Sequence, residues 1–67
     1  MTVNGKKVAL QAEMSLAVFL ESRGYHLPSL ARIAIEKNGV IIPKESYTSE
    51  MLADGDTLEI VGYVGGG

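Results

Sequence analysis

Several short segments of the chain alternate apolar and polar residues, a period that is typical of β-strands with one buried face. Two Asn-Gly dipeptides, Asn4-Gly5 and Asn38-Gly39, lie between such segments and favour tight hairpin turns, because both central positions of these turns need positive φ. The pattern therefore predicts two hairpins and one later strand. The predicted strands are 2–3, 7–11, 32–37, 40–42 and 57–63.

One segment has a helical period instead. Its apolar side chains recur at positions i, i+3 and i+4 over 16–23, which predicts a helix with one apolar face. Ser15 is a good N-cap because its hydroxyl can accept a hydrogen bond from a free backbone N–H. Gly24 suits the left-handed position that follows the last turn. The apolar face consists of Leu16, Phe19 and Leu20.

The element order is β-β-α-β-β-β, which predicts an α+β fold: a mixed, mostly antiparallel sheet with one helix packed on one face. The other face is left to solvent or to a partner. Pro43 ends the fourth strand because it lacks the N–H of a sheet ladder, and 45–52 is expected to be irregular, with room for one helical turn. The expected core consists of Leu16, Phe19, Leu20, Ile33, Ile35, Leu58 and Ile60.

The composition narrows the function classes. The chain has 67 residues, the size of one small domain, and 46% of them are hydrophobic, so some apolar surface is expected to face a partner. It has no cysteine, which excludes disulfides, thiolate metal sites and a cysteine nucleophile, and fits a reducing cytoplasm. A net charge of −2 argues against nucleic-acid binding, and no segment resembles a signal peptide or a membrane span. We expect a cytoplasmic protein that is monomeric when free.

No combination of side chains in the sequence indicates an active site of its own. His26 is the single histidine and has no partner at a useful spacing, so a loop position without a catalytic role explains it better. Asp54 and Asp56 are better explained as a tight turn, with Gly55 at positive φ, than as metal ligands. We therefore expect neither an enzyme nor a bound metal or cofactor, but a protein on which another enzyme acts.

The glycine run Gly65-Gly66-Gly67 follows the apolar residues of the last predicted strand without a polar linker. Glycine costs entropy to order and has no side chain to pack, so the run adds nothing to a fold. It would suit a tail that enters a narrow channel of another enzyme and presents a bare carboxylate there. A frayed terminus or an expression remnant is the simpler alternative. We predict a folded domain over 1–63 and a flexible tail over 64–67.

In this order the segments resemble the ThiS family, the ubiquitin-like β-grasp sulfur carriers of thiamin biosynthesis. The small subunit of molybdopterin synthase has the same fold and ending, but it is usually longer and tends to have prolines before the tail. This chain has Gly62-Tyr63-Val64 there, which favours ThiS, although its first strand is short. The resemblance covers essentially the whole chain and rests on Ser15-Leu16, the strand-turn-strand segment 33–44, Tyr47, the turn and strand 54–60, and the ending Val64-Gly65-Gly66-Gly67.

The resemblance implies a specific chemistry for the terminus. An E1-like adenylating enzyme (ThiF-like) would use ATP and Mg²⁺ to convert the Gly67 carboxylate into an acyl-adenylate. Sulfur from a donor such as a cysteine desulfurase persulfide would then replace AMP and leave a thiocarboxylate on Gly67. A thiazole synthase (ThiG-like) would take that sulfur into the thiazole ring. Val64, Gly65 and Gly66 would thread the partner's channel, where a larger side chain would obstruct passage.

The partner is expected to dock on the open face of the sheet, beside the tail. Strand alternation places Val61 on the face opposite Leu58 and Ile60, and Ile41 is a second candidate anchor. Two alternatives stay open. One is a carrier that supplies sulfur to another pathway, such as molybdopterin, cysteine or homocysteine synthesis, and the other is a non-catalytic ubiquitin-like interaction module with an inert tail.

Overall fold

The computed structural model describes residues 1–10, 12–26 and 32–62. The predicted tail over 64–67 therefore lies outside the described residues. In chain order, the elements are β1 (Thr2–Val3), β2 (Lys6–Lys7), β3 (Met14–Ser15), α1 (Leu16–Ser22), β4 (Ile33–Lys37), β5 (Val40–Ile42), the 3₁₀ helix η1 (Lys44–Ser46), β6 (Met51–Leu52) and β7 (Thr57–Gly62).

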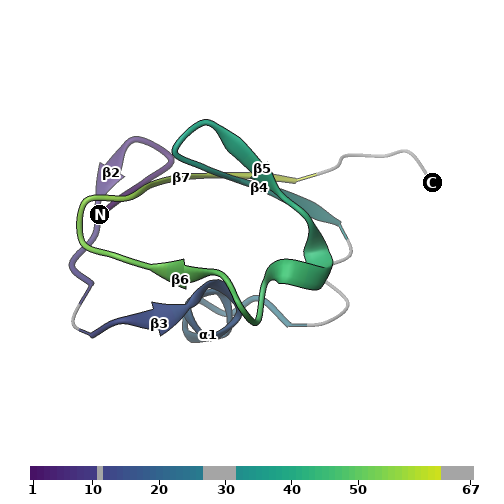
Figure 1. Ribbon diagram of the computed structural model, residues 1–67. Coiled ribbons are helices and arrows are strands. Elements are labelled where there is room, and N and C mark those ends of the chain that lie inside the picture. The colour runs from purple at the N-terminus through teal and green to yellow at the C-terminus, as the bar shows by residue number, and fades with distance from the viewer. Residues whose placement is uncertain (11, 27–31, 63–67) are drawn as a thin grey trace.

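The main sheet has five strands in the order β2-β1-β7-β4-β5. β1 and β7 are parallel, and the other neighbouring pairs of this sheet are antiparallel. Figure 1 shows this sheet as one layer and α1, with the short strands β3 and β6, as a second layer against one of its faces. The predicted α+β arrangement, a mixed sheet with one helix on one face, is confirmed.

Helix α1 begins and ends where its local chemistry predicts. The Ser15 side chain accepts a hydrogen bond from the Val18 N–H at 3.2 Å, which satisfies one of the free donors of the first turn. Gly24 follows the helix at φ 93°, the left-handed conformation that glycine adopts without strain. The helix is one residue shorter than the predicted 16–23, because Arg23 is its C-cap.

The core lies between α1 and the sheet. All of the predicted core residues are buried except Ile60, which is half-buried and packs against the edge of the cluster. Four further core residues were not predicted, because each lies in a two- or three-residue strand or in the irregular segment, where no period can be recognised. These residues are Val3, Ile42, Tyr47 and Leu52.

The segment expected to be irregular contains a second, two-stranded sheet. The 3₁₀ helix η1 supplies the predicted helical turn, but β6 then pairs antiparallel with β3, an element that the sequence pattern did not predict. The backbone joins this segment to the helix as well: the Leu16 N–H donates to the Glu50 carbonyl at 2.7 Å, and the Ala17 N–H donates to the Tyr47 carbonyl at 2.9 Å. The start of α1 is therefore anchored to 47–52.

Both Asn-Gly turns have the predicted positive φ, with Asn4 at 50° and Asn38 at 51°. Two details of the sequence prediction were wrong. The second strand covers Lys6–Lys7 rather than 7–11, because β1 offers only two residues for pairing. Gly55 is not in the left-handed region, and the turn there is instead closed by a hydrogen bond from the Asp56 N–H to the Ala53 carbonyl at 3.1 Å.

Candidate functional site

The predicted reactive tail continues from the end of β7. Gly67 and the channel residues Val64, Gly65 and Gly66 lie outside the described residues. The last described residue, Gly62, pairs with Ile33 at the beginning of β4. The described part of the site is thus the surface around the end of β7.

The sheet has one face toward the core and one that no helix of the described residues covers. Ile33 and Ile35 point to the core, so alternation along β4 places Ala34 and Glu36 on the open face. Val61 pairs with Ala34, and Ile41 pairs with Glu36, so both predicted anchors share this open face on the two strands that flank β4. Val61 is 56% exposed and Ile41 is 62% exposed.

Two carboxylates lie next to these apolar side chains. Glu36 on β4 pairs directly with Glu59 on β7, and both are on the open face. Like charges directly opposite each other on a sheet repel, which disfavours the free sheet. Among the described residues, the ion pairs involve other carboxylates. The open face thus combines exposed apolar groups with an acidic pair, and sequence reasoning missed the pair because it requires the β4–β7 register.

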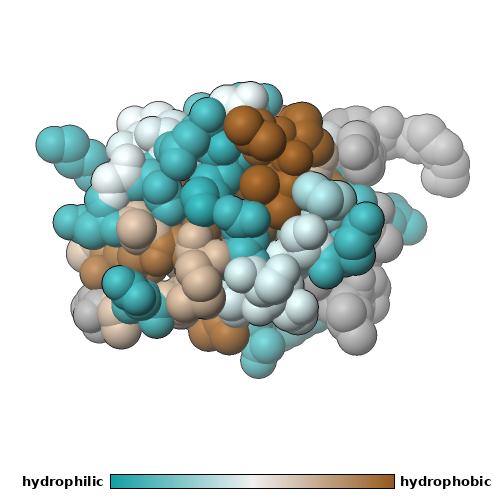
Figure 2. All heavy atoms as spheres, viewed as in Figure 1, coloured by the Kyte–Doolittle hydropathy of each residue, from teal (hydrophilic) through white to brown (hydrophobic). Residues whose placement is uncertain are grey.

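Exposed apolar residues also gather at the β4–β5 hairpin. Val40 is exposed next to Ile41 on β5, the edge strand of the main sheet. Figure 2 shows a hydrophobic cluster over β5, bordered on one side by hydrophilic residues. A contiguous exposed patch of this kind is a common mark of a protein partner.

A cluster of charges around Lys37, at the hairpin end of β4, fastens the turn before β7. Lys37 Nζ donates to Glu50 Oε2 at 2.7 Å and to the Met51 carbonyl at 2.9 Å, and it lies 3.8 Å from Asp56 Oδ2. The hydrogen bond to Glu50 raises the pKa of Lys37, an effect that desolvation opposes and the two carboxylate charges support. These contacts join β4, β6 and the turn before β7, so we assign them a structural role.

Asp56 is the acceptor at the centre of this turn. Its carboxylate accepts hydrogen bonds from the Ala53 N–H at 2.8 Å and from Asn38 Nδ2 at 2.9 Å. Burial acts to raise the pKa of Asp56, but these hydrogen bonds and the charge of Lys37 outweigh it and hold the pKa below its ordinary value. The turn interpretation of Asp54 and Asp56 is therefore confirmed, and the sequence did not indicate the ties to Lys37 and Asn38.

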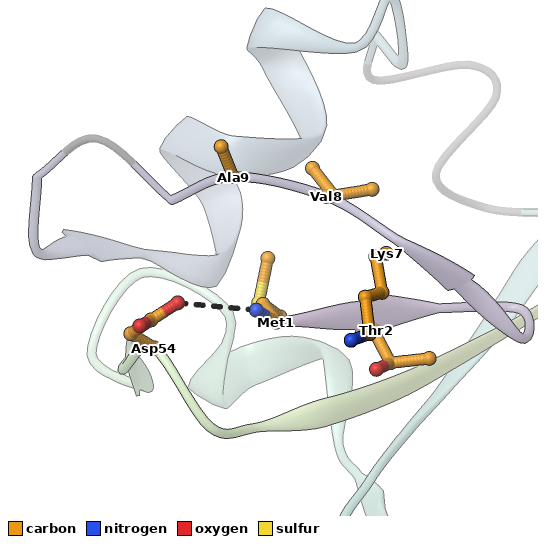
Figure 3. Close-up of a pocket in the computed structure, with 6 residues that line it drawn as sticks. All are labelled: Met1, Thr2, Lys7, Val8, Ala9 and Asp54. Carbon is orange, nitrogen blue, oxygen red and sulfur yellow. Dashed lines mark hydrogen bonds and ion pairs between the residues drawn. The ribbon is translucent and has the colours of Figure 1, made fainter.

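A pocket of about 420 Å³ lies near the beginning of the chain, where the Met1 ammonium donates to Asp54 Oδ1 at 3.2 Å. Figure 3 shows this ion pair beside the strand that carries Thr2 and the segment that carries Val8 and Ala9. Its residues supply no nucleophile with an adjacent base. The pocket lining consists of Met1, Thr2, Lys7, Val8, Ala9 and Asp54.

Over residues 1–10, 12–26 and 32–62, no three His, Cys, Asp or Glu side chains come together as metal ligands. His26 is exposed. In the same part of the chain, no helix has the length and apolar character that crossing a bilayer requires.

Known proteins resemble the whole chain. The ThiS family profile matches residues 1–67. A protein of Paramagnetospirillum magneticum named thiazole synthase is 36% identical over 67 residues, which is 100% of this chain but only 20% of that protein. The chain thus spans about a fifth of the length of this curated relative.

Two solved structures have the same fold. The crystal structure of the thiamine biosynthesis protein ThiS from Geobacter metallireducens is similar with a TM-score of 0.82 and 25% identity, covering 98% of this chain and 96% of that one. An NMR structure of a thiamine biosynthesis protein from the same organism gives a TM-score of 0.74 and 26% identity, covering 98% and 85%. With a family match over every residue and a matching β-grasp fold, the chain belongs to the ThiS family.

Proposed function

We propose that the chain carries sulfur as a thiocarboxylate on Gly67 and delivers it for thiazole formation. The observation that carries this proposal is the family match over residues 1–67, which includes the glycine ending. The fold supports it, since β7 leads directly into the residues that would react and an exposed, partly apolar face lies beside its end. The chain acts as the substrate of other enzymes rather than as an enzyme.

The chemistry needs an activated terminus, because a carboxylate is a poor electrophile. A Gly67 carboxylate oxygen attacks the α-phosphorus of ATP in an E1-like adenylating enzyme, and pyrophosphate leaves with its Mg²⁺. The terminal sulfur of a cysteine desulfurase persulfide then attacks the carbonyl carbon, and AMP leaves with the bonding electrons of the C–O bond. A thiol then attacks the desulfurase sulfur of the resulting acyl disulfide. The S–S bond breaks, the thiol and the desulfurase cysteine become joined in a disulfide, and the thiocarboxylate leaves. The chain itself binds no cofactor in this scheme.

The adenylating enzyme docks on the open sheet face, with Val61 and Ile41 as apolar anchors. Their exposure and their common face support this arrangement. The facing carboxylates of Glu36 and Glu59 favour a basic group on the partner, because such a group would relieve their repulsion. Val64, Gly65 and Gly66 then reach into the channel that leads to ATP.

Thiazole synthase receives the sulfur. The relative that carries this name matches the full length of the chain within a much longer protein, which supports a functional link between the two. A sulfurated chain that thiazole synthase does not accept would instead indicate a carrier for another pathway.

A chain lengthened by one alanine after Gly67 tests the proposal. The extension moves the carboxylate by up to about 3.6 Å, and a displacement of about 1 Å can cost on the order of 10²-fold in a positioned reaction. Both chains are incubated with ATP, Mg²⁺, a purified E1-like adenylating enzyme, a persulfide-loaded cysteine desulfurase and a thiol. Intact mass spectrometry should show the parent, but not the extended chain, exchanging one oxygen for sulfur.

The two chains should also unfold at the same urea concentration, because the extension adds nothing to the core. A parent chain that gains no sulfur, or an extended chain that gains it equally fast, contradicts the proposed function. An inert parent would agree with a plain ubiquitin-like interaction module.

A further inference from the structure

Among the described residues, one side chain, that of Asn4, binds β7 at Ile60 on the edge that faces β1. β1 pairs with β7 only as far as Val3 and Leu58, whereas β7 continues to Gly62. Past this pairing, the Ile60 N–H donates to Asn4 Oδ1 at 2.6 Å, and Asn4 Nδ2 donates to the Ile60 carbonyl at 3.3 Å. The Asn4 amide thus takes the place of the next peptide group of a neighbouring strand.

The first hairpin turn holds this amide in position. Asn4 and Gly5 have φ of 50° and 83°, and the Asn4 N–H donates to the Leu58 carbonyl at 2.9 Å. The main chain and the side chain of Asn4 therefore bind alternate residues of β7. Asparagine suits this position because it tolerates positive φ and carries both a donor and an acceptor on a short side chain.

The opposite edge of the same segment pairs with β4. Ala34 faces Val61 and Ile33 faces Gly62, so the last residues of β7 are held by β4 on one edge while Asn4 holds Ile60 on the other. Residues 63–67 follow directly in the chain. In a reaction at a terminal carboxyl, the point and direction at which the chain leaves the fold limit where that carboxyl can reach.

We propose that Asn4 is a positioning residue for the adenylation of Gly67: its amide fixes the end of β7 and thereby the course of the residues that enter the partner enzyme. This inference rests on the proposed function, since it concerns the same reaction. The two side-chain hydrogen bonds are exposed to solvent, so their contribution to global stability is small. Their effect on the reaction is therefore separable from their effect on folding.

The second Asn-Gly turn supplies a matched control. Asn38 has nearly the same φ as Asn4, and its Oδ1 accepts from the Thr57 N–H at 2.9 Å, at the beginning of β7. Asn4→Gly and Asn38→Gly thus remove the same amide from two Asn-Gly turns, one bound at Ile60 and the other at the beginning of β7. Asn38→Gly also removes the donor to Asp56 Oδ1 at 2.9 Å, so it should lose at least as much stability as Asn4→Gly and controls for an effect of stability on the rate. Glycine keeps positive φ without strain, so both variants should fold.

Pyrophosphate release by the adenylating enzyme is measured at varied concentrations of the parent and each variant. We expect kcat for Asn4→Gly to fall about tenfold with KM within about threefold, because binding is retained while the carboxyl is presented less often. For Asn38→Gly, kcat should stay within about twofold of the parent. Asn4→Asp keeps the acceptor for the Ile60 N–H and should recover part of the rate.

Amide hydrogen exchange at Ile60 should be faster in Asn4→Gly than in Asn38→Gly, because only the first variant removes its acceptor. Equal kcat for the parent and Asn4→Gly overturns the positioning role and leaves the proposed function intact. Equal losses in the two glycine variants also overturn it, since they indicate a general effect of stability. A parent chain that is never adenylated overturns the proposed function and this inference together.

Discussion

The turn before β7 contains two aspartates with very different surroundings, and we expect neutralising them to have different effects on stability. The side chain of Asp56 is 14% exposed and lies in the Lys37 cluster, whereas that of Asp54 is 86% exposed and pairs with the Met1 ammonium. Asp56→Asn keeps the size of the side chain and removes its charge. Asp54→Asn is the matched control in the same turn.

The expected loss of stability in Asp56→Asn follows from the hydrogen bonds of Asp56. Its carboxylate accepts from the Ala53 N–H and from Asn38 Nδ2, and an amide can accept only one of them, since its NH₂ group would face the other donor. Losing one hydrogen bond to a charged group costs about 1.5–3 kcal/mol, so we expect Asp56→Asn to lower the free energy of unfolding by about 2 kcal/mol. For Asp54→Asn the expected loss is below about 1 kcal/mol, because exposed ion pairs contribute little.

Urea denaturation, followed by circular dichroism at several pH values, tests both the size of the loss in free energy of unfolding and the direction in which it changes with pH. Folding lowers the pKa of Asp56, so the folded state binds fewer protons than the unfolded state at pH values between the folded and unfolded pKa. The charged Asp56 therefore stabilises the fold fully only above its pKa in the unfolded chain. This stabilisation is lost as pH falls through the folded pKa. The difference between the parent and Asp56→Asn should therefore shrink as pH falls below the ordinary aspartate pKa of 3.8.

Equal losses for the two aspartate variants at neutral pH would refute the assigned role of Asp56. A difference that stays constant on acidification would refute the electrostatic part of the reasoning.

Two further predictions concern the core and the docking face. Phe19→Ala removes a buried ring and should lower the free energy of unfolding, measured by urea denaturation, by about 3–5 kcal/mol, a large part of the roughly 3–10 kcal/mol expected for a domain of this size. Val18→Ala, on the exposed side of α1, should lower it by less than about 0.5 kcal/mol. Similar losses in the two variants would contradict the observed helix orientation. Val61→Asp should leave the unfolding midpoint nearly unchanged but lower kcat/KM for adenylation on the order of tenfold, by placing a charge among apolar contacts. Ile41→Asp should act in the same direction, and unchanged kinetics in either variant would remove that residue from the interface.

Most features that depend on neighbours in the chain were predicted correctly from the sequence, although the positive φ expected at Gly55 was not. The Ser15 cap, the left-handed Gly24 and the positive φ of both Asn-Gly turns arise from the geometry of a few consecutive residues. The two faces of β4 follow from alternation alone. Local rules were less reliable for the lengths of elements, as the short β2 shows, because a strand extends only as far as its partner does.

The functional prediction came from the sequence as well, through the glycine ending and the ordered set of motifs that resemble ThiS, and the family match agrees with it. The surface around the end of β7 could be predicted only in part. Alternation placed Val61 on the open face, but the facing of Glu36 and Glu59 depends on the register between β4 and β7. Register is set by the packing of whole strands, which no short window of sequence contains.

Only the tertiary structure decided the contacts between distant parts of the chain. The hydrogen bonds of Asn4 to Ile60 join residues 56 positions apart. The hydrogen bond of Lys37 to Glu50 and its ion pair with Asp56 connect β4 with the segment before β7. The pairing of β3 with β6 is of the same kind, since two residues are too few to show a period. The sequence by itself determined which residues would turn, cap and alternate, because those properties belong to local backbone and side-chain chemistry. The fold then determined which of them meet.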